Sequence, residues 1–250
     1  NQGLCDSLTA SIQEMKITRP QRVHPASLSI DELLDNSSWF TELDEATRRQ
    51  VRGDISERVL AQGDSLGHSG ERQHAWFGVL EGLIKWSIPS RDGRSVTLAG
   101  QSVGSWFGEG TLLRNTPRPS DLVALRHSRV AQLPFHTFDW LRHHSPSFND
   151  FLLSQVNERM HWLMAHFAAY CLLGTDSRVA LALVGMVHPL PNPFGGRHLQ
   201  LSQEELANLA AVSRQSCNSA LMRFKEAGLV RSEYGGIVVL ELPGLQALTH

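Results

Sequence analysis

The middle of the chain carries short runs in which hydrophobic and polar residues alternate. From Val59 to Leu133, turn signals such as Glu81-Gly82 separate these runs. A period of two is typical of strands with one buried face. Five runs have this form: residues 75–80, 83–88, 95–99, 121–125 and 129–133. Several short strands at even spacing predict a β-barrel or jelly roll.

The next segment has the period of a helix. Ser145 can cap a helix that starts at Pro146, and no residue as far as Leu172 breaks it. Apolar residues recur at spacings of three and four, which makes a heptad seam: Leu153, Val156, Met160, Leu163, Phe167 and Tyr170. Other apolar residues lie off the seam: Phe151, Leu152, Trp162 and Met164. The seam can pack in the core of its own chain, but two apolar stripes indicate two partners.

Near the C-terminus, residues 201–216 predict a short helix, a tight turn and the start of a second helix. Ser202 can cap the first helix, with an acidic residue three positions on to complete a capping box, and Ser213 can cap the second. Gly228 suits the end of the second helix. Residues 229–240 predict two strands around a Gly-Gly turn. Together these elements predict a winged helix-turn-helix.

The second of these helices exposes polar side chains on its first turn. Arg can bind guanine with two hydrogen bonds and Gln can bind adenine in the same way, so Arg214 and Gln215 suit the major groove of DNA. An ordinary helical hairpin with a solvated face is the alternative. The candidate DNA contacts are Ser202, Ser213, Arg214, Gln215, Ser216, Asn218, Ser219 and Arg223.

Composition narrows the class of protein. A chain of 250 residues with 41% hydrophobic and 19% charged residues is long enough for two folded domains. No apolar run has the length of a membrane span.

The net charge of −2 does not indicate nucleic-acid binding, although only the local electrostatic field over the second helix matters for phosphate contact. Cys5, Cys171 and Cys217 lie far apart, so we expect free thiols in a reducing cytoplasm.

The C-terminal segment resembles the DNA-binding domain of the cyclic-AMP receptor protein/FNR (Crp/Fnr) family of transcription regulators. The resemblance is carried by Leu206-Ala207, Val212-Ser213-Arg214, Leu221, Phe224 and Gly228-Leu229-Val230. Further motifs extend it from about Asn36 to Leu242: Gln62-Gly63-Asp64, Glu81-Gly82, Asp92-Gly93-Arg94 and Phe107-Gly108-Glu109. It implies an α+β fold with a cyclic-nucleotide-type β-roll in residues 1–145, a dimerisation helix and hinge in 146–174, and a winged helix-turn-helix in 175–250.

The resemblance also implies a phosphate-binding cassette in the roll. Gly108 and Glu109 fit it, whereas Pro119 separates Arg118 from Ser120 and removes a backbone donor. On the long helix, Leu163 and Met164 stand where members that bind cyclic AMP place Thr-Ser. We therefore expect no tight binding of cyclic AMP. The candidate effector residues are Gly108, Glu109, Arg118, Ser120, Leu163 and Met164.

The resemblance implies a homodimeric regulator that binds a near-palindromic operator, contacts RNA polymerase and responds to an unknown small molecule. A cyclic-nucleotide or haem sensor on the same fold is the runner-up. An iron–sulfur cluster is not expected, because the N-terminal segment has only Cys5.

Haem stays open among the candidate ligands His127, His136, His143, His144, His161 and His166, although no His-Cys or His-Met pair has ligand spacing. We expect no metal site, and no catalytic motif indicates an enzyme.

Overall fold

The computed structural model describes residues 27–249, except 91–94, 189–192, 195 and 234. Two compact units divide the chain, one of residues 25–158 and one that holds residues 159–250. The boundary between the two units lies inside the long helix α7, Pro146–Leu172. The three-part division at residues 145 and 174 stays a prediction.

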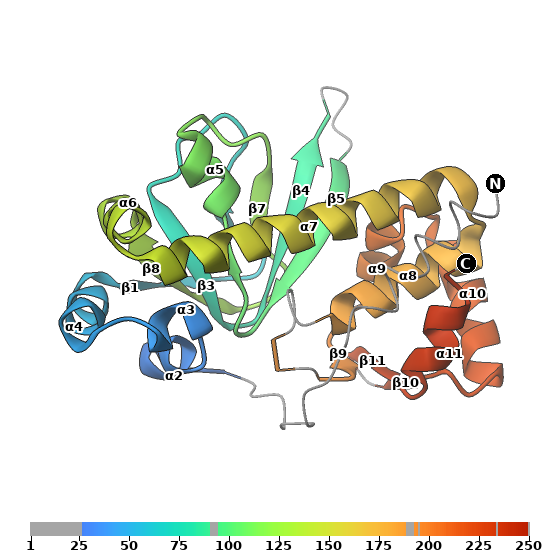
Figure 1. Ribbon diagram of the computed structural model, residues 1–250. Coiled ribbons are helices and arrows are strands. Elements are labelled where there is room, and N and C mark those ends of the chain that lie inside the picture. Colours follow the sequence, from blue (N-terminus) through green and yellow to red (C-terminus); the bar gives the residue numbers. More distant parts are fainter. Residues whose placement is uncertain (1–26, 91–94, 189–192, 195, 234, 250) are drawn as a thin grey trace. The chain divides into compact units, whose positions relative to one another are not determined.

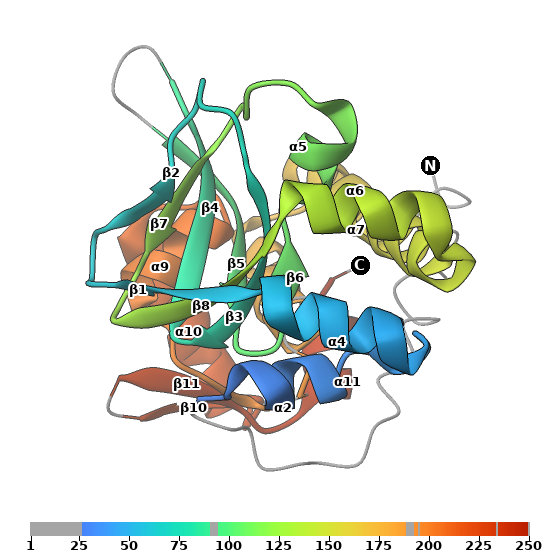
Figure 2. The same cartoon turned by 90° about the vertical axis from the view of Figure 1, so that its left-hand side faces the viewer.

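The first unit is built on two antiparallel four-stranded sheets (Figures 1 and 2), with strand orders β1-β8-β3-β6 and β2-β7-β4-β5. The strands are β1 Ser56–Leu60, β2 Ser65–Gly67, β3 Ala75–Glu81, β4 Leu83–Pro89, β5 Ser95–Ser102, β6 Trp106–Phe107, β7 Asp121–Ala124 and β8 Ser128–Pro134. Side chains from both sheets share one core, including Leu60, Phe77, Val79, Ile84, Phe107 and Leu122. The predicted β-roll is confirmed.

The five predicted strands correspond to β3, β4, β5, β7 and β8. The alternating pattern did not predict β1, β2 and β6. Strand β1 buries only Leu60 and leaves Val59 exposed, so its sequence does not alternate. Strands β2 and β6 have three and two residues, which is too short for a period of two to show.

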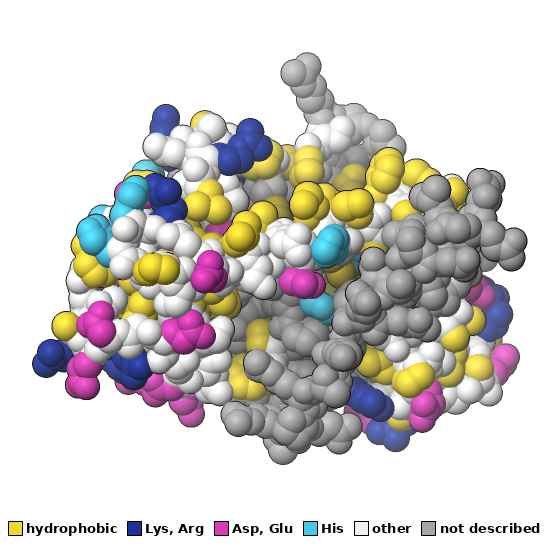
Figure 3. Space-filling view, in the orientation of Figure 1, with side chains coloured by type: hydrophobic (Ala, Val, Ile, Leu, Met, Phe, Trp, Pro, Cys, Tyr) yellow, Lys and Arg dark blue, Asp and Glu magenta, His cyan; other side chains and the backbone are white. Residues whose placement is uncertain are grey.

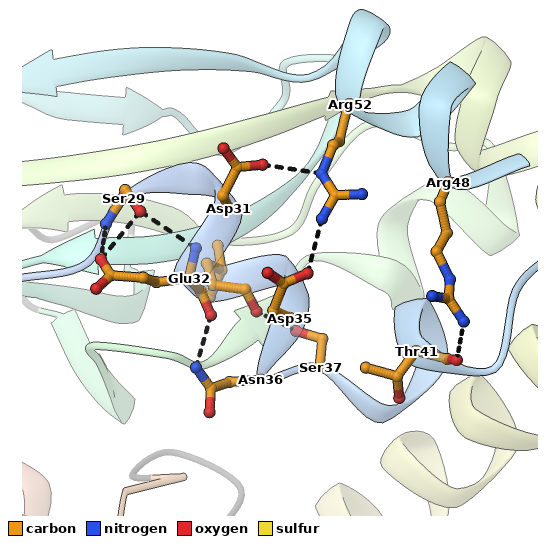
Figure 4. Close-up of polar contacts among 10 residues, drawn as sticks. Ser29, Asp31, Glu32, Asp35, Asn36, Ser37, Thr41, Arg48 and Arg52 are labelled. Carbon is orange, nitrogen blue, oxygen red and sulfur yellow. Dashed lines mark hydrogen bonds and ion pairs between the residues drawn. The ribbon is translucent and has the colours of Figure 1, made fainter. Parts of the chain in front are cut away.

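Short helices surround the roll within the same unit. They are α2 Ile30–Asp35, α3 Ser38–Thr41, α4 Glu45–Asp54, α5 Glu109–Arg114 and α6 Phe135–His144. A capping box begins α2: Glu32 N donates to Ser29 Oγ over 3.2 Å, and Ser29 N donates to Glu32 Oε2 over 2.8 Å (Figure 4). The hydrogen bond from the Ser29 backbone lowers the pKa of Glu32. Arg52 of α4 bridges Asp31 and Asp35 of α2.

An aromatic cluster joins these helices to the sheet. Trp76 of β3 stacks on Trp106 of β6 with 4.4 Å between ring centroids, and Trp39 of α3 lies 5.3 Å from Trp76. Phe148, in the first turn of α7, contacts both Trp39 and Trp76 at 5.4 and 5.6 Å. Each such pair stabilises the folded state by about 0.5–1.5 kcal/mol beyond the free energy gained from the apolar area that it buries. Gly78 makes room for the cluster, since a β-carbon there would lie 3.2 Å from the Trp106 ring.

The second unit has the predicted winged helix-turn-helix. After α7 come α8 Thr175–Val187, β9 His198–Leu199, α9 Gln203–Leu209, α10 Arg214–Glu226, β10 Val230–Glu233, β11 Gly236–Val239 and α11 Leu242–Ala247. The three strands pair in the order β10-β11-β9. Helix α8 is buried from Val179 to Val187, and α9, α10 and α11 all pack against it. None of the described helices combines the length and the apolar character needed to cross a membrane.

Two histidines of this unit lie in poorly solvated surroundings. His166 of α7 packs against Trp162, with 3.8 Å between the ring centroids, and His188 follows the last turn of α8. Burial lowers the pKa of each imidazole from 6.5 to about 4. Both rings are therefore neutral in the folded protein at neutral pH.

We predict that acid destabilises this unit. Each imidazole has a lower pKa in the folded state than in the unfolded state. The free energy of unfolding therefore has its full value above pH 6.5 and decreases as pH falls from about 6.5 toward 4. The expected loss by pH 4.5 is about 2.5 kcal/mol per histidine. Urea unfolding at fixed protein concentration measures it. His166→Gln should flatten the pH dependence, whereas His161→Gln, an exposed neighbour on the same helix, should not. Equal profiles for the two variants would contradict the assignment.

Candidate functional site

Serine side chains cap both helices of the helix-turn-helix, as the sequence predicts. Ser202 Oγ accepts from Glu205 N over 3.1 Å, and Glu205 Oε2 accepts from Ser202 N over 2.7 Å. Ser213 Oγ accepts from Ser216 N over 3.1 Å at the start of α10. The Ser213 hydroxyl also donates to Ser216 Oγ over 2.8 Å. Three candidate contacts, Ser202, Ser213 and Ser216, therefore have a structural use within the motif.

The turn between α9 and α10 is held from outside by Arg178 of α8. Its guanidinium donates to the Ala210 carbonyl through Nε and Nη2, over 3.2 and 3.1 Å, and Nη2 also donates to the Ala211 carbonyl. Ala211 has a positive φ of 50°, a backbone conformation that costs energy in a residue with a β-carbon. The guanidinium also lies over the Tyr170 ring, 4.6 Å from its centroid. Nothing in the sequence around Arg178 indicated this role.

One face of α10 is apolar and the other is exposed. Cys217, Ala220, Leu221 and Phe224 are buried, and burial raises the pKa of the Cys217 thiol to about 11, so this thiol stays protonated. The exposed residues follow helical spacing: Arg214, Gln215, Asn218, Ser219 and Met222. Met222 is 57% exposed. Although Met222 is apolar, its helical phase places it on the exposed face with Gln215 and Asn218 rather than with the buried Leu221 and Phe224.

Arg223, another candidate contact, is paired with a carboxylate. Its Nε donates to Asp176 Oδ2 over 2.7 Å, and its Nη2 donates to Asp176 Oδ1. The hydrogen bonds that Arg223 donates to the Asp176 carboxylate raise the pKa of Arg223. Asp176 lies in the first turn of α8, so this ion pair joins α10 to α8.

The predicted cassette lies in the roll. Gly108, with φ 96°, precedes Glu109, the first residue of α5. Glu109 is only 3% exposed, and one of its carboxylate oxygens accepts from Trp76 Nε1 over 3.4 Å. Arg118 and Ser120 are each 4% exposed.

Gln73, which the sequence did not single out, joins two parts of this cassette. Its amide nitrogen donates to the carbonyl of Gly108 over 3.0 Å, and its amide oxygen accepts from Arg118 Nη2. Burial lowers the pKa of Arg118, an effect that the carboxylates of Glu71 and Asp121 oppose. The structure therefore brings Gly108 and Arg118 together through a side chain between them.

The heptad seam of α7 is exposed along its length. The exposed fractions run from 38% at Val156 to 70% at Leu153 and Phe167, and hydrophobic side chains follow α7 in Figure 3. Leu163 and Met164, the predicted effector contacts on this helix, are also more than half exposed. The seam therefore does not use the core of its own chain, which was the alternative considered from the sequence.

Several of the histidines considered for haem lie beside other side chains of the protein. His127 lies 3.6 Å from Glu81, His136 lies 3.8 Å from Asp54, and His143 lies 3.6 Å from Asp139. His144 stacks on Trp140. Among the described residues, no three His, Cys, Asp or Glu side chains gather as a metal site would require.

Comparison with known proteins matches both halves of the chain to families. Residues 57–145 match the cyclic nucleotide-binding domain, and residues 177–248 match the Crp-like helix-turn-helix domain. The first range covers the roll from β1 to α6, and the second covers the described elements from α8 to α11.

Relatives share this organisation over nearly their whole length. A CRP-like cAMP-activated global transcriptional regulator of Mycobacterium tuberculosis is 22% identical over 84% of this chain and 95% of its own. The transcriptional regulator SdrP of Thermus thermophilus is 26% identical over 80% of this chain and 96% of its own. The solved structure of FixK2 from Bradyrhizobium japonicum has a TM-score of 0.68 at 16% identity, covering 78% of this chain and 98% of that one. The chain belongs to the Crp/Fnr family of DNA-binding transcription regulators, which are not enzymes.

Proposed function

We propose that this regulator works as a homodimer whose two α10 helices enter successive major grooves of a near-palindromic operator. The exposed polar face of α10 is the observation that carries this proposal. Two helices related by a two-fold axis would meet half-sites roughly 34 Å apart, one turn of B-DNA. The net charge of −2 does not oppose binding, because α10 itself carries Arg214, Arg223 and Lys225 against Glu226.

The exposed side chains of α10 suit different kinds of contact with DNA. Arg214 can hold guanine through O6 and N7, and Gln215 or Asn218 can hold adenine through N6 and N7. Met222 offers an apolar contact for a thymine methyl group. The Ser219 hydroxyl donates to the Gln215 carbonyl over 3.1 Å, so it contacts DNA best as an acceptor. The hydroxyls of Ser202, Ser213 and Ser216 serve as caps, and their helix termini suit phosphate contacts.

We predict that Arg214→Ala removes specific operator binding and leaves the fold intact. The lost bidentate contact should cost about 1–3 kcal/mol per half-site. Gel-shift titration against an operator selected in vitro measures this loss. Arg49→Ala removes the same charge from an exposed position on α4 and is the matched control. Unchanged affinity of the Arg214 variant at moderate salt would rule out the base-contact role.

We predict that Asp176→Asn strengthens DNA binding, because it releases Arg223 from its ion pair and makes the guanidinium available to a phosphate. The slope of log K against log salt should steepen by about 0.9 for each phosphate gained. The fold should survive, since exposed ion pairs contribute about 0–1 kcal/mol. Salt titrations of the variant and of Glu45→Gln, a charge change of the same sign on α4, separate a local from a global effect. Weaker binding by the Asp176 variant would show that the pair chiefly positions α10.

The exposed seam supports the dimer. Helix α7 has 27 residues and a length of about 40 Å at about 1.5 Å per residue. Its seam keeps heptad spacing for almost three heptads, from Leu153 to Tyr170. Pairing with the same helix of a second chain in a parallel coiled coil buries these apolar side chains.

We predict that Leu163→Glu gives a folded monomer, because it places two carboxylates against each other in the paired seam. Analytical ultracentrifugation measures the change in mass. Ser154→Glu, an exposed residue of the same helix that lies off the seam, should leave the dimer intact. A fully dimeric Leu163 variant would place the dimer contact elsewhere.

The roll supports a sensory role. Glu109, Arg118 and Ser120 are buried polar residues of the cassette region, and with Gly108 they are the proposed effector contacts of the roll. Relatives named as cAMP-activated favour a phosphate-bearing effector as the second candidate, although Pro119 interrupts the cassette. Contact with RNA polymerase, activation of transcription and a cytoplasmic location belong to the same proposal. They are supported by the family and by the free thiols of Cys171 and Cys217.

A further inference from the structure

The described part of the roll buries the guanidinium of Arg118, and no carboxylate of the described residues is in hydrogen-bond contact with it. Arg118 is 4% exposed. Among the described residues, its one side-chain hydrogen bond goes to the neutral amide oxygen of Gln73, and its Nε has no hydrogen-bond partner. Burying a charge is costly unless it is paired, so this group retains a strong preference for an anionic acceptor.

The two acids whose charges act on Arg118 do not meet that preference. Glu71 and Asp121 act on Arg118 through their charge, and each carboxylate is engaged elsewhere. Glu71 Oε2 accepts from His68 N over 2.8 Å, and Asp121 Oδ1 accepts from Ser69 N over 2.8 Å. Their hydrogen bonds hold the loop that follows β2. The charges of the two acids lower the free-energy cost of burying the guanidinium, but their oxygens do not accept hydrogen bonds from its N–H groups.

Gln73 is held in place at the guanidinium by the surrounding backbone. Its amide nitrogen donates to the carbonyls of Ala75, over 2.7 Å, and Gly108, over 3.0 Å. These two bonds turn the amide oxygen toward Arg118. Two glycines provide the space: a β-carbon at Gly108 would overlap the Gln73 amide, and one at Gly67 would overlap Arg118 Nη1.

We propose that the amide oxygen of Gln73 occupies the position of an anionic oxygen at Arg118, so that a phosphate-bearing effector must displace it. This inference rests on the proposed effector site at Glu109 and Arg118. A phosphate oxygen makes a charge-assisted hydrogen bond, roughly twice as strong as the bond to a neutral amide. Against that gain stands the loss of the two bonds from the Gln73 amide nitrogen, unless new acceptors replace them. Gln73 thereby weakens the response to phosphate compounds and sets its threshold.

The test compares variants of Gln73 in the full-length protein by calorimetry, with inorganic phosphate and cyclic AMP as probes. Wild type should bind both only in the millimolar range. Gln73→Ala removes the competing oxygen and should bind each at least about tenfold more tightly. Gln73→Glu keeps the reach of the side chain and offers Arg118 a carboxylate, so it should bind neither. Operator binding by gel shift provides a separate check that each variant stays folded and competent for DNA.

Three results would overturn the inference: low-micromolar binding by wild type, a folded Gln73→Ala variant with unchanged affinity, or a Gln73→Glu variant that binds as Gln73→Ala does. If Gln73→Ala does not fold, Gln73→Asn serves instead, because its shorter amide retains polarity and withdraws the oxygen from Arg118. Tighter phosphate binding with no change for cyclic AMP would support the role of Gln73. It would also show that the proposed effector site beside Glu109 does not accept a nucleotide.

Discussion

The packing of Trp76 is the interaction on which most of the first unit depends. Its ring contacts Trp39, Trp106, Phe138, Phe148 and Phe151, which come from α3, β6, α6 and α7. Its indole nitrogen donates to Glu109, the acid of the cassette. A single side chain thus touches the proposed effector site and the first two turns of the long helix. Because close-packed aromatic rings leave little empty volume, a change in the position of Glu109 must be accommodated by the rings around Trp76.

A comparable constraint operates in the second unit, where the first turn of α8 determines how α10 is presented. Arg178 satisfies the carbonyls of the turn before α10, and Asp176 holds Arg223 on the helix itself. Backbone carbonyls left without partners would cost about 1–3 kcal/mol each where they are shielded from water. Two polar residues only two positions apart therefore contact α10 and the turn before it, and Arg178 is the one that satisfies the backbone of that turn.

The elements with a local signal could be predicted from the sequence, and those that depend on distant partners could not. Capping at Ser202 and Ser213 involves residues three apart, and it is confirmed. The heptad seam is equally local. Gln73 gave no signal, because its partners Gly108 and Arg118 lie 35 and 45 residues away. The pairing of Arg223 spans 47 residues, and a lone basic side chain on a helix looks the same whether it contacts a phosphate or a carboxylate.

The seam of α7 continues across the boundary between the two units. Leu153 and Val156 belong to the unit that contains the roll, whereas Leu163, Phe167 and Tyr170 belong to the unit that contains the helix-turn-helix. Pairing with a second chain would therefore bury residues of both units in one continuous interface. Tyr170 also packs against Arg178, which holds the turn before α10. A dimer formed through this seam would place a side chain of the interface one contact away from the turn that positions the DNA-binding helix, so the state of the dimer and the geometry of DNA recognition would be physically linked.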